Sequence, residues 1–400
     1  MFPDPRQDIG RQPALAESAL GFNMGTAVAR KNNIVQGIIH GIHGALKRQD
    51  AITFIKGPAR FVDPHEIDTG ESRLTARTII IATGARRAVP AIEGLDEAEY
   101  LTNRSALELD HVPSSIVVVG GGYVGIEFAQ MLSRCGSRVT LLGRNDQIAS
   151  GEDAELSTLL ADMLRDEGIA VHTGVTVRKV HRSNGPYRIT STGFDGEQQF
   201  EADDLLLATG RVGNTDDLGL SAAGIAIRKR EFIPTNDQLQ SNQSHIFAIG
   251  DVKGGWMFTH VATYDGPIAA HNAVSTASRT VAYRVVPRAI FSDPTLAAVG
   301  LTETEARDRG HDVAVGWFPL SARVPWPSAT REAVGNRWST GQTGKSWAST
   351  SSRPMATICS TRRWPLCTGA VGSTVSVHRF PCIRLSARWL SRQHEPRGNQ

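Results

Sequence analysis

The spacing of apolar residues changes along the chain, and each spacing predicts a different kind of element. Within the first 50 residues, Ile34, Ile38 and Ile42 recur at helical intervals, which predicts a mostly helical start. From Ile52 the period falls to two, and glycines and prolines divide the segment into short strands. Four later apolar runs predict strands that each end in a turn, at residues 78–82, 115–119, 204–208 and 245–249.

Helical patterns separate these strands. Residues 126–132 and 156–166 have helical spacing, and residues 138–142 and 170–177 predict two further strands. Strands that alternate with helices predict parallel sheets covered on both faces. The expected fold class is therefore α/β, with two Rossmann-like nucleotide-binding units.

The strand predicted at 115–119 runs directly into a glycine-rich turn and then a helix. Gly120, Gly122 and Gly125 stand there in G-x-G-x-x-G register, which is the context that a dinucleotide site requires. Gly120 permits the tight turn, Gly122 lets the backbone approach a pyrophosphate, and Gly125 lets the helix pack on the strand. The pyrophosphate would face the N–H groups of the helix's first turn. The alternative is a glycine-rich turn without a ligand.

The next strand lacks an acidic residue at the position that binds the ribose 2′-hydroxyl of NADH. Arg144 follows this strand instead, with Arg138 and Arg134 as nearby candidates. A guanidinium can pair with a 2′-phosphate, which favours NADPH over NADH. A solvent-exposed arginine without a ligand is the open alternative.

Three motifs together resemble a known family. They are Gly-Gly-Gly-Tyr-Val-Gly-Ile-Glu at 120–127, two Ala-Thr-Gly turns, and Ile-Phe-Ala-Ile-Gly-Asp at 246–251. With residues 290–294 and 299–303, they resemble the class I pyridine nucleotide-disulfide oxidoreductases, which include glutathione reductase, dihydrolipoamide dehydrogenase and mercuric reductase. The resemblance covers residues 31–335 and is greatest to mercuric reductase-like members.

This resemblance implies FAD and NAD(P)H as cofactors and gives roles to single positions. Asp251 matches the aspartate that binds the ribityl chain of FAD, although a helix-capping or turn aspartate is the simpler reading. Tyr123 matches the aromatic residue that gates the nicotinamide pocket, and Glu127 matches the acid beside the nicotinamide and flavin N5. Residues 259–271 match the helix whose N-terminal dipole would stabilise reduced flavin.

Other cofactor contacts are expected at strand-end turns. Thr83, Gly84 and Gly210 lie in the Ala-Thr-Gly turns, where small residues allow a nucleotide to approach the backbone closely. Val124 belongs to the glycine loop and completes the expected NAD(P) contacts. A plain turn at the end of a strand is the alternative for each of these positions.

No catalytic motif of the family is intact in the sequence. The family passes a hydride from NAD(P)H to FAD, to a Cys-x-x-x-x-Cys disulfide, and on to a small disulfide or metal-thiolate substrate. Cys135 is the only cysteine before position 337, and we expect it to be a buried, inert thiol. A first G-x-G-x-x-G for the FAD pyrophosphate and a closing His-Pro-Thr-x-x-Glu are also missing. We therefore expect a start downstream of the redox centre and weak FAD binding.

The composition changes abruptly near the end of the chain. The whole sequence has a net charge of +3, yet residues 337–400 carry ten Lys or Arg against one acid, Glu395. In a shifted reading frame, residues 382–388 can encode His-Pro-Thr-Leu-Ser-Glu, and residues 337–350 can encode a strand–turn–strand. We therefore hypothesise a frameshift near Asn336. Stop codons or unrelated residues in that frame of the nucleotide sequence would contradict it.

Two other interpretations of this tail fit its sequence less well than the frameshift. Basic residues with interleaved tryptophans suggest a nucleic-acid-binding segment. Cys359, Cys367 and Cys382 suggest a metal site, but their spacing fits no common zinc pattern. We expect neither a nucleic-acid partner nor a metal, and an irregular, disordered tail.

The expected organisation has five parts. They are a partial FAD-binding domain at 1–112, an NAD(P)-binding domain at 113–233, the remainder of the FAD-binding domain at 234–285, a partial α+β dimerisation domain at 286–336, and the tail at 337–400. The resemblance implies a homodimer. With no apolar run of about 18 residues and no signal-peptide pattern, we expect no membrane association and a cytoplasmic location.

Three functional hypotheses follow. The first is a functional reductase of this family. The second is a disulfide-independent flavin reductase or NADH oxidase. The third is a non-catalytic NAD(P)-binding remnant of a damaged gene. For the sequence as it stands, the missing motifs favour the third.

Overall fold

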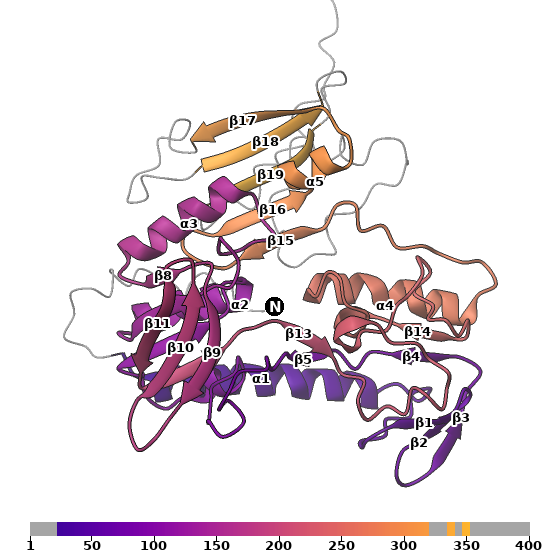
Figure 1. Ribbon diagram of the computed structural model, residues 1–400. Coiled ribbons are helices and arrows are strands. Elements are labelled where there is room, and N and C mark those ends of the chain that lie inside the picture. The colour runs from indigo at the N-terminus through magenta and orange to yellow at the C-terminus, as the bar shows by residue number, and fades with distance from the viewer. Residues whose placement is uncertain (1–21, 320–333, 341–345, 353–400) are drawn as a thin grey trace, which may run out of the picture. The chain divides into compact units, whose positions relative to one another are not determined.

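The computed structural model describes residues 22–319, 334–340 and 346–352. The chain divides into two compact units, whose elements are labelled in Figure 1. Unit 1 comprises Met1–Arg60, Ile67–Leu74 and Arg86–Val212, and unit 2 comprises Phe61–Glu66, Thr75–Ala85 and Gly213–Gln400. Within the described ranges, no helix combines the length and apolar character needed to cross a membrane.

Unit 1 is built on a four-stranded parallel sheet in the order β12-β6-β7-β8. Its strands are β6 (Ser115–Val119), β7 (Arg138–Leu142), β8 (Ala170–His172) and β12 (Asp204–Leu207). The helices α2 (Tyr123–Arg134) and α3 (Ala154–Asp166) connect β6 to β7 and β7 to β8. All five residues of β6 are buried, as expected for a strand covered on both faces. The predicted parallel α/β unit is confirmed.

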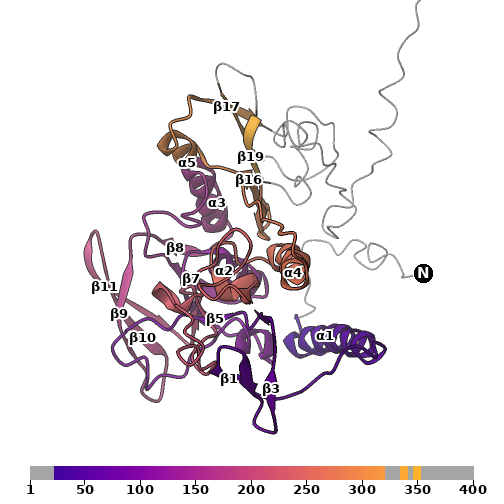
Figure 2. The same cartoon turned by 90° about the vertical axis from the view of Figure 1, so that its right-hand side faces the viewer.

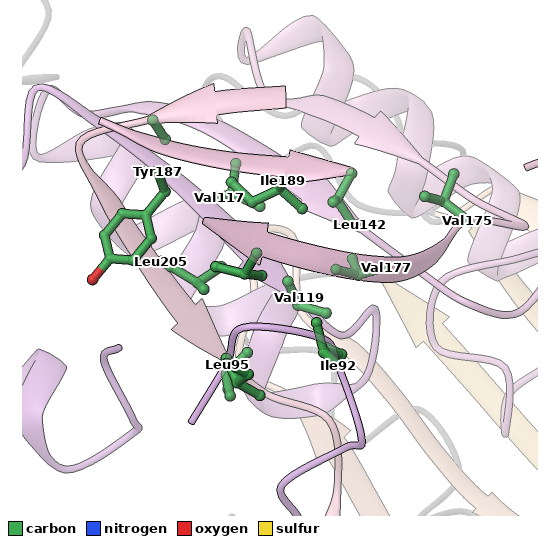
Figure 3. Packing of buried hydrophobic residues seen from close by; sticks show 13 residues of the cluster. Ile92, Leu95, Val117, Val119, Leu142, Val175, Val177, Tyr187, Ile189 and Leu205 are labelled. Carbon is green, nitrogen blue, oxygen red and sulfur yellow. The ribbon is translucent and has the colours of Figure 1, made fainter. Parts of the chain in front are cut away.

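An antiparallel sheet in the order β11-β10-β9 lies beside this parallel sheet, as Figures 1 and 2 both show. Its strands are β9 (Thr176–His181), β10 (Tyr187–Gly193) and β11 (Gly196–Ala202). Alternate residues of β10 point inward, so Tyr187 and Ile189 join Val117 of β6 in one apolar core (Figure 3). Each fully buried side chain of this size stabilises the fold by roughly 1.5–3 kcal/mol.

The predicted helix in the first 50 residues is confirmed for the part of this segment that the structure describes. α1 (Met24–Lys47) begins at Asn23, whose side chain accepts a hydrogen bond of 2.8 Å from the Thr26 N–H. This contact satisfies one of the N–H groups that the first turn of a helix leaves without a helical partner. Lys31 of α1 forms an ion pair with Glu108, which lies in the short helix η1 (Ser105–Glu108).

Unit 2 contains a parallel strand pair and the helix α4 (Thr259–Val274). β4 (Ile79–Ile81) pairs with β14 (Ile246–Ala248), and the short helix η3 (Gly250–Lys253) follows β14. Phe247 packs with Leu239, Ile268 and Ala269 in a small apolar core. The carboxyl ends of β4 and β14 therefore lie at one edge, which is where parallel sheets bind ligands.

A five-stranded antiparallel sheet follows in unit 2, with the order β15-β16-β19-β18-β17. Its elements are β15 (Pro287–Ile290), β16 (Leu296–Gly300), α5 (Glu303–Asp308), β17 (Val313–Pro319), β18 (Val334–Thr340) and β19 (Ser346–Ser352). A capping box between Thr302 and Glu305 starts α5. The expected α+β character of this region is confirmed.

This sheet differs from the expectation of an irregular tail beginning at position 337. Residues 337–340 continue β18, and residues 346–352 form β19, which pairs with both β16 and β18. The hydrogen bonds of a sheet join backbone groups, so a strand can form where the side chains show no strand pattern. The remaining tail positions, including Cys359, Cys367 and Cys382, lie outside the described residues.

The remaining described elements are short. One small sheet contains β1 (Arg60–Asp63), β2 (Glu66–Asp68) and β3 (Arg73–Thr75), and another pairs β5 (Ala85–Arg87) with β13 (Arg211–Gly213). The short helix η2 (Lys229–Glu231) contains Arg230 at a φ of 63°.

Candidate nucleotide-binding sites

The glycine turn of unit 1 has the geometry that its sequence predicts. Gly120 has a φ of 127°, and a Cβ at this position would lie 2.2 Å from the carbonyl oxygen of Ala208. A Cβ on Gly125 would lie 1.8 Å from the carbonyl oxygen of Gly120. Both contacts are far below van der Waals distance, so only glycine permits this close packing of α2 on the sheet.

The surroundings of Gly122 differ from those of Gly120 and Gly125. A Cβ here would meet no atom of the described residues within 4 Å beyond its chain neighbours. Gly122 is the N-cap of α2, and no side-chain hydrogen bond caps this end of the helix. The partial positive charge of the helix N-terminus therefore faces a position without a side chain, which is the arrangement that binds a phosphate group.

The other predicted residues of this loop lie on the first turns of α2. Tyr123 is half-buried, and its hydroxyl donates a hydrogen bond to the carboxylate of Glu152. Val124 is 37% exposed, and Glu127 is half-buried one turn further along α2. Glu127 is therefore not a fully solvated residue of the helix surface.

Gly210 lies at the same sheet edge as the glycine turn. β12 runs parallel to β6, and the N–H of Ala208 donates to the carbonyl of Val119 at 2.8 Å. Gly210 is exposed, with a φ of 105°. The structure thus brings Ala208 and Thr209, the residues directly before Gly210, next to Gly120, although the two segments are distant in sequence.

The three arginine candidates differ in position. Arg144 is exposed and follows the carboxyl end of β7. Arg138 begins β7, which places it about 13 Å along the strand from that end. Arg134 forms an ion pair with Glu167, with 2.6 Å between its Nη2 and the carboxylate. Arg144 is thus the one of these three arginines that follows the strand end beside the glycine turn, and 2′-phosphate binding by any of them stays a prediction.

A second set of predicted residues lies at the carboxyl edge of β4 and β14 in unit 2. Gly84 has a φ of 73°, and a Cβ there would meet nothing within 4 Å among the described residues. Thr83 is fixed by Asn214: the Thr83 hydroxyl donates to the Asn214 carbonyl at 2.9 Å, and the Asn214 amide donates to the Thr83 carbonyl at 2.8 Å. Asp251 follows β14 within η3.

The helix α4 continues from this edge. Its N-cap is Phe258, which forms no side-chain cap bond, so the helix dipole is not neutralised by a capping side chain. The rings of Trp256, Phe258 and His260 stack in sequence, at centroid distances of 6.1 and 5.4 Å. Burial lowers the pKa of His260, which keeps this histidine neutral.

The described residues contain neither a metal site nor a reactive cysteine. No group of three or more His, Cys, Asp or Glu side chains in these ranges has the geometry to hold a metal ion. Cys135 ends α2, is half-buried and has a free thiol, whose pKa is raised by burial. A raised pKa disfavours the thiolate, so the thiol is chemically quiet as expected.

Two acidic residues at these edges were not predicted from the sequence. Glu152 accepts a hydrogen bond from the hydroxyl of Tyr123, and Asp265 of α4 accepts one of 3.1 Å from the N–H of Gly250. Their contacts join positions 29 and 15 residues apart, respectively. No local spacing signals such contacts, because they depend on how the elements pack.

Comparison with known proteins places these features in a family. Residues 4–266 match the family model described as "Pyridine nucleotide-disulphide oxidoreductase". Residues 286–333 match the dimerisation domain of the same family. The first match covers more than half of the chain.

Individual proteins show the same relationship. The chain is 40% identical to a mercuric reductase of Staphylococcus aureus over 281 residues, which cover 70% of this chain and 51% of the relative. It is 35% identical to a dihydrolipoyl dehydrogenase of Mycobacterium leprae over 314 residues, which cover 76% and 66%. The chain thus spans about half the length of the S. aureus relative.

A solved structure agrees in fold. The HOCl-induced flavoprotein disulfide reductase RclA from Escherichia coli superposes with a TM-score of 0.79 at 27% identity. The superposition covers 87% of this chain and 80% of RclA. On these matches and on its glycine-turn geometry, the chain belongs to the pyridine nucleotide-disulphide oxidoreductase family.

Proposed function

We propose that the protein is a flavin-dependent oxidoreductase that takes a hydride from NAD(P)H. The observation that carries this proposal is the glycine turn of unit 1. Two of its glycines are closed by backbone atoms, whereas Gly122 between them is open at the N-terminus of α2. A turn that served packing alone would have no need for an open glycine at that point.

NAD(P)H fits the residues of this turn. Its pyrophosphate would lie against the first turn of α2, with Gly122 and Val124 alongside and Gly210 at the neighbouring strand end. Tyr123 and Glu127 would border the nicotinamide. Arg144 follows the end of β7 and would bind a 2′-phosphate, so we propose NADPH as the preferred donor.

FAD fits the edge of β4 and β14 in unit 2. Thr83 and Gly84 form a turn without side-chain bulk, fixed by Asn214, and Asp251 supplies a carboxylate at the neighbouring strand end. Asp251 would accept hydrogen bonds from the ribityl hydroxyls, and the N-terminus of α4 would stabilise negative charge on the ring. When bound, FAD would supply the two-electron acceptor for the hydride.

The final acceptor is proposed by class only. The relatives are named mercuric reductase, dihydrolipoyl dehydrogenase and disulfide reductase, so we propose a small disulfide or metal-thiolate substrate. The sequence contains no Cys-x-x-x-x-Cys, and we place no residue of this chain in the disulfide step. We further propose a homodimer, formed through the domain matched at residues 286–333.

Visible absorbance of the purified full chain tests this proposal. We expect flavin absorbance after reconstitution with FAD, and bleaching of that absorbance when NADPH is added without oxygen. A second aliquot receives NADH at the same concentration, to measure the preference between the donors. A protein that binds NADPH but does not retain or reduce FAD would contradict the proposal.

The absent cysteine pair favours a second candidate, an NAD(P)-binding protein without turnover. It predicts saturable quenching of tryptophan fluorescence by NADPH, with no NADPH oxidation whether or not FAD is added. Addition of NADPH to the FAD-reconstituted protein therefore separates the candidates. Bleaching of the flavin absorbance supports the first, and NADPH binding without FAD reduction supports the second.

A further inference from the structure

A buried aspartate of α4 joins three separate segments of unit 2. The side chain of Asp265 is fully buried, at 0% exposure. Its Oδ2 accepts the N–H of Gly250 at 3.1 Å and lies 3.5 Å from the Nζ of Lys253. Its Oδ1 accepts the hydroxyl of Tyr283 at 2.5 Å. Two of these contacts, to Gly250 and Lys253, lie in the turn after β14.

The partners of this carboxylate are themselves constrained. The side chain of Lys253 is only 6% exposed, and its Nζ lies 4.5 Å from the centre of the Tyr283 ring. Burial, followed by the hydrogen bond to Asp265, raises the pKa of Tyr283 well above its usual range. The hydroxyl of Tyr283 therefore stays protonated and remains a donor.

An ion pair with this burial does not by itself imply a gain in stability. Removing two charges from water costs about as much as their attraction returns, and apolar side chains of equal volume often replace such pairs without loss. A buried pair that also binds a backbone N–H fixes that backbone in one conformation.

The fixed segment is the turn from which Asp251 projects. Gly250 has a φ of 67°, and a Cβ on it would lie 3.1 Å from the Cβ of Ala262 in α4. The N–H of Gly254 donates to the carbonyl of Asp251 at 3.0 Å and closes the turn. The backbone on both sides of Asp251 is thus held, and the Asp265 carboxylate binds the N–H of Gly250, the residue directly before Asp251.

We propose that Asp265 is a positioning residue for FAD, which holds the Gly250–Asp251 turn so that the Asp251 carboxylate meets the ribityl hydroxyls. The inference rests on the proposed function, because it assigns the ribityl contact to Asp251. The Nζ of Lys253 lies 3.5 Å from the Asp265 carboxylate as its counter-ion, and the Tyr283 hydroxyl orients that carboxylate. Asp265 itself does not touch the cofactor.

A double-mutant cycle on the full chain tests this role. FAD affinity is measured by the quenching of flavin fluorescence for the wild type, Asp251→Ala, Asp265→Asn and the double variant. We expect each single change to raise the FAD dissociation constant by about 10-fold. Asp265→Asn should add less than about 2-fold once Asp251 is absent, because a positioning residue acts only through its target.

Thermal unfolding in the absence of FAD supplies the readout for a merely structural role. In that case Asp265→Asn would lower the melting temperature of the FAD-free protein, while the added stability on binding FAD would stay as large as in the wild type. That result, or full additivity in the cycle, would overturn the inference. A smaller FAD-dependent increment in melting temperature supports it.

A milder variant covers the case in which Asp265→Asn does not fold. Tyr283→Phe removes one hydroxyl and leaves the ion pair and the Gly250 contact in place. We expect a rise of about 3-fold in the FAD dissociation constant, which disappears in the Asp251→Ala background. A wild-type chain that binds no FAD would overturn the proposed function as well, whereas wild-type binding with an additive cycle overturns the inference alone.

Discussion

The hydroxyl of Tyr123, at the first position of α2, donates a hydrogen bond to Glu152, whose carboxylate is almost fully buried in the segment before α3. This bond joins the proposed nicotinamide gate to the loop that follows β7. The same loop is tied to the glycine turn, since the N–H of Ala149 donates to the carbonyl of Gly121 at 2.7 Å. The loop after β7 and the glycine turn therefore form one connected structure.

Removing the Tyr123 hydroxyl should destabilise this structure without removing the aromatic ring. In Tyr123→Phe, the buried Glu152 carboxylate loses a donor, and we expect the free energy of unfolding to fall by about 1–3 kcal/mol. Glu152→Gln keeps an acceptor oxygen and should cost less. Urea denaturation of both variants measures the difference. Equal midpoints for Tyr123→Phe and the wild type would show that the bond does not form in solution.

Alanine should lower the stability of the protein at Gly125 and leave it unchanged at Gly122. Gly125→Ala places a methyl group 1.8 Å from the Gly120 carbonyl oxygen, and overpacking of this kind costs typically ~1–3 kcal/mol. Gly122→Ala adds its methyl group where no described atom lies within 4 Å, at a φ of −92° that alanine adopts freely. Its stability should match the wild type.

The two variants are informative together because Gly125→Ala should be the less stable of the two, whereas Gly122→Ala should bind NADPH less tightly. A methyl group on Gly122 occupies the approach of the pyrophosphate, so we expect the NADPH dissociation constant of Gly122→Ala to rise by about 10-fold or more. Thermal unfolding and NADPH titration are measured on both variants. Unchanged NADPH affinity in Gly122→Ala would remove the main support for the nucleotide site.

Charge removal at Arg144 should separate the two pyridine nucleotides. Arg144→Ala should weaken NADPH by about 10-fold, the usual order for a lost charge-assisted contact to a phosphate, and leave NADH unchanged. Arg138→Ala is the control, because this exposed arginine lies at the opposite end of β7. Dissociation constants for both nucleotides decide the outcome. An equal loss for NADH and NADPH would mean that Arg144 does not contact the 2′-phosphate.

The parts of the site that the sequence predicts are the parts held by local geometry. The strand, the glycine turn and the helix are consecutive in the chain, so Gly120, Gly122 and Gly125 are recognisable together. Gly210 and Gly84 are recognised less securely, since each becomes part of a site only when its strand pairs with a distant one.

Contacts that depend on packing are the ones that the sequence does not predict. Arg134 matched the expected phosphate ligands in type, but Glu167, 33 residues away, pairs with it. Glu152 gave no signal because an acidic residue just before a helix is usually interpreted as a solvated or capping residue. Asp265 gave none because its partners lie in other segments than α4. In the tail, backbone pairing formed β19 at residues with no alternating pattern. The spacing of apolar residues in the sequence therefore does not mark every strand.

Two histidines should make the stability of the protein depend on pH. Burial, together with the nearby Arg165, lowers the pKa of His172, and burial lowers that of His260. Both groups bind a proton more weakly in the folded protein than in the unfolded chain. Between the folded pKa and the unfolded value of about 6.5, the unfolded chain holds more protons, so stability rises with pH in this window. The contribution is complete above it and is lost as the pH falls through the lowered pKa.

Denaturant unfolding at a series of pH values from about 7 down to about 5 measures this effect. We expect the free energy of unfolding to fall across the series, and His172→Gln to reduce the slope because a neutral amide cannot take up the proton. His40→Gln is the matched control, since His40 is exposed on α1. The His172 ring lies 5.0 Å from that of Phe200, centre to centre, so the cost of lost packing should appear equally at every pH. A slope that His172→Gln leaves unchanged would assign the pH dependence to other groups.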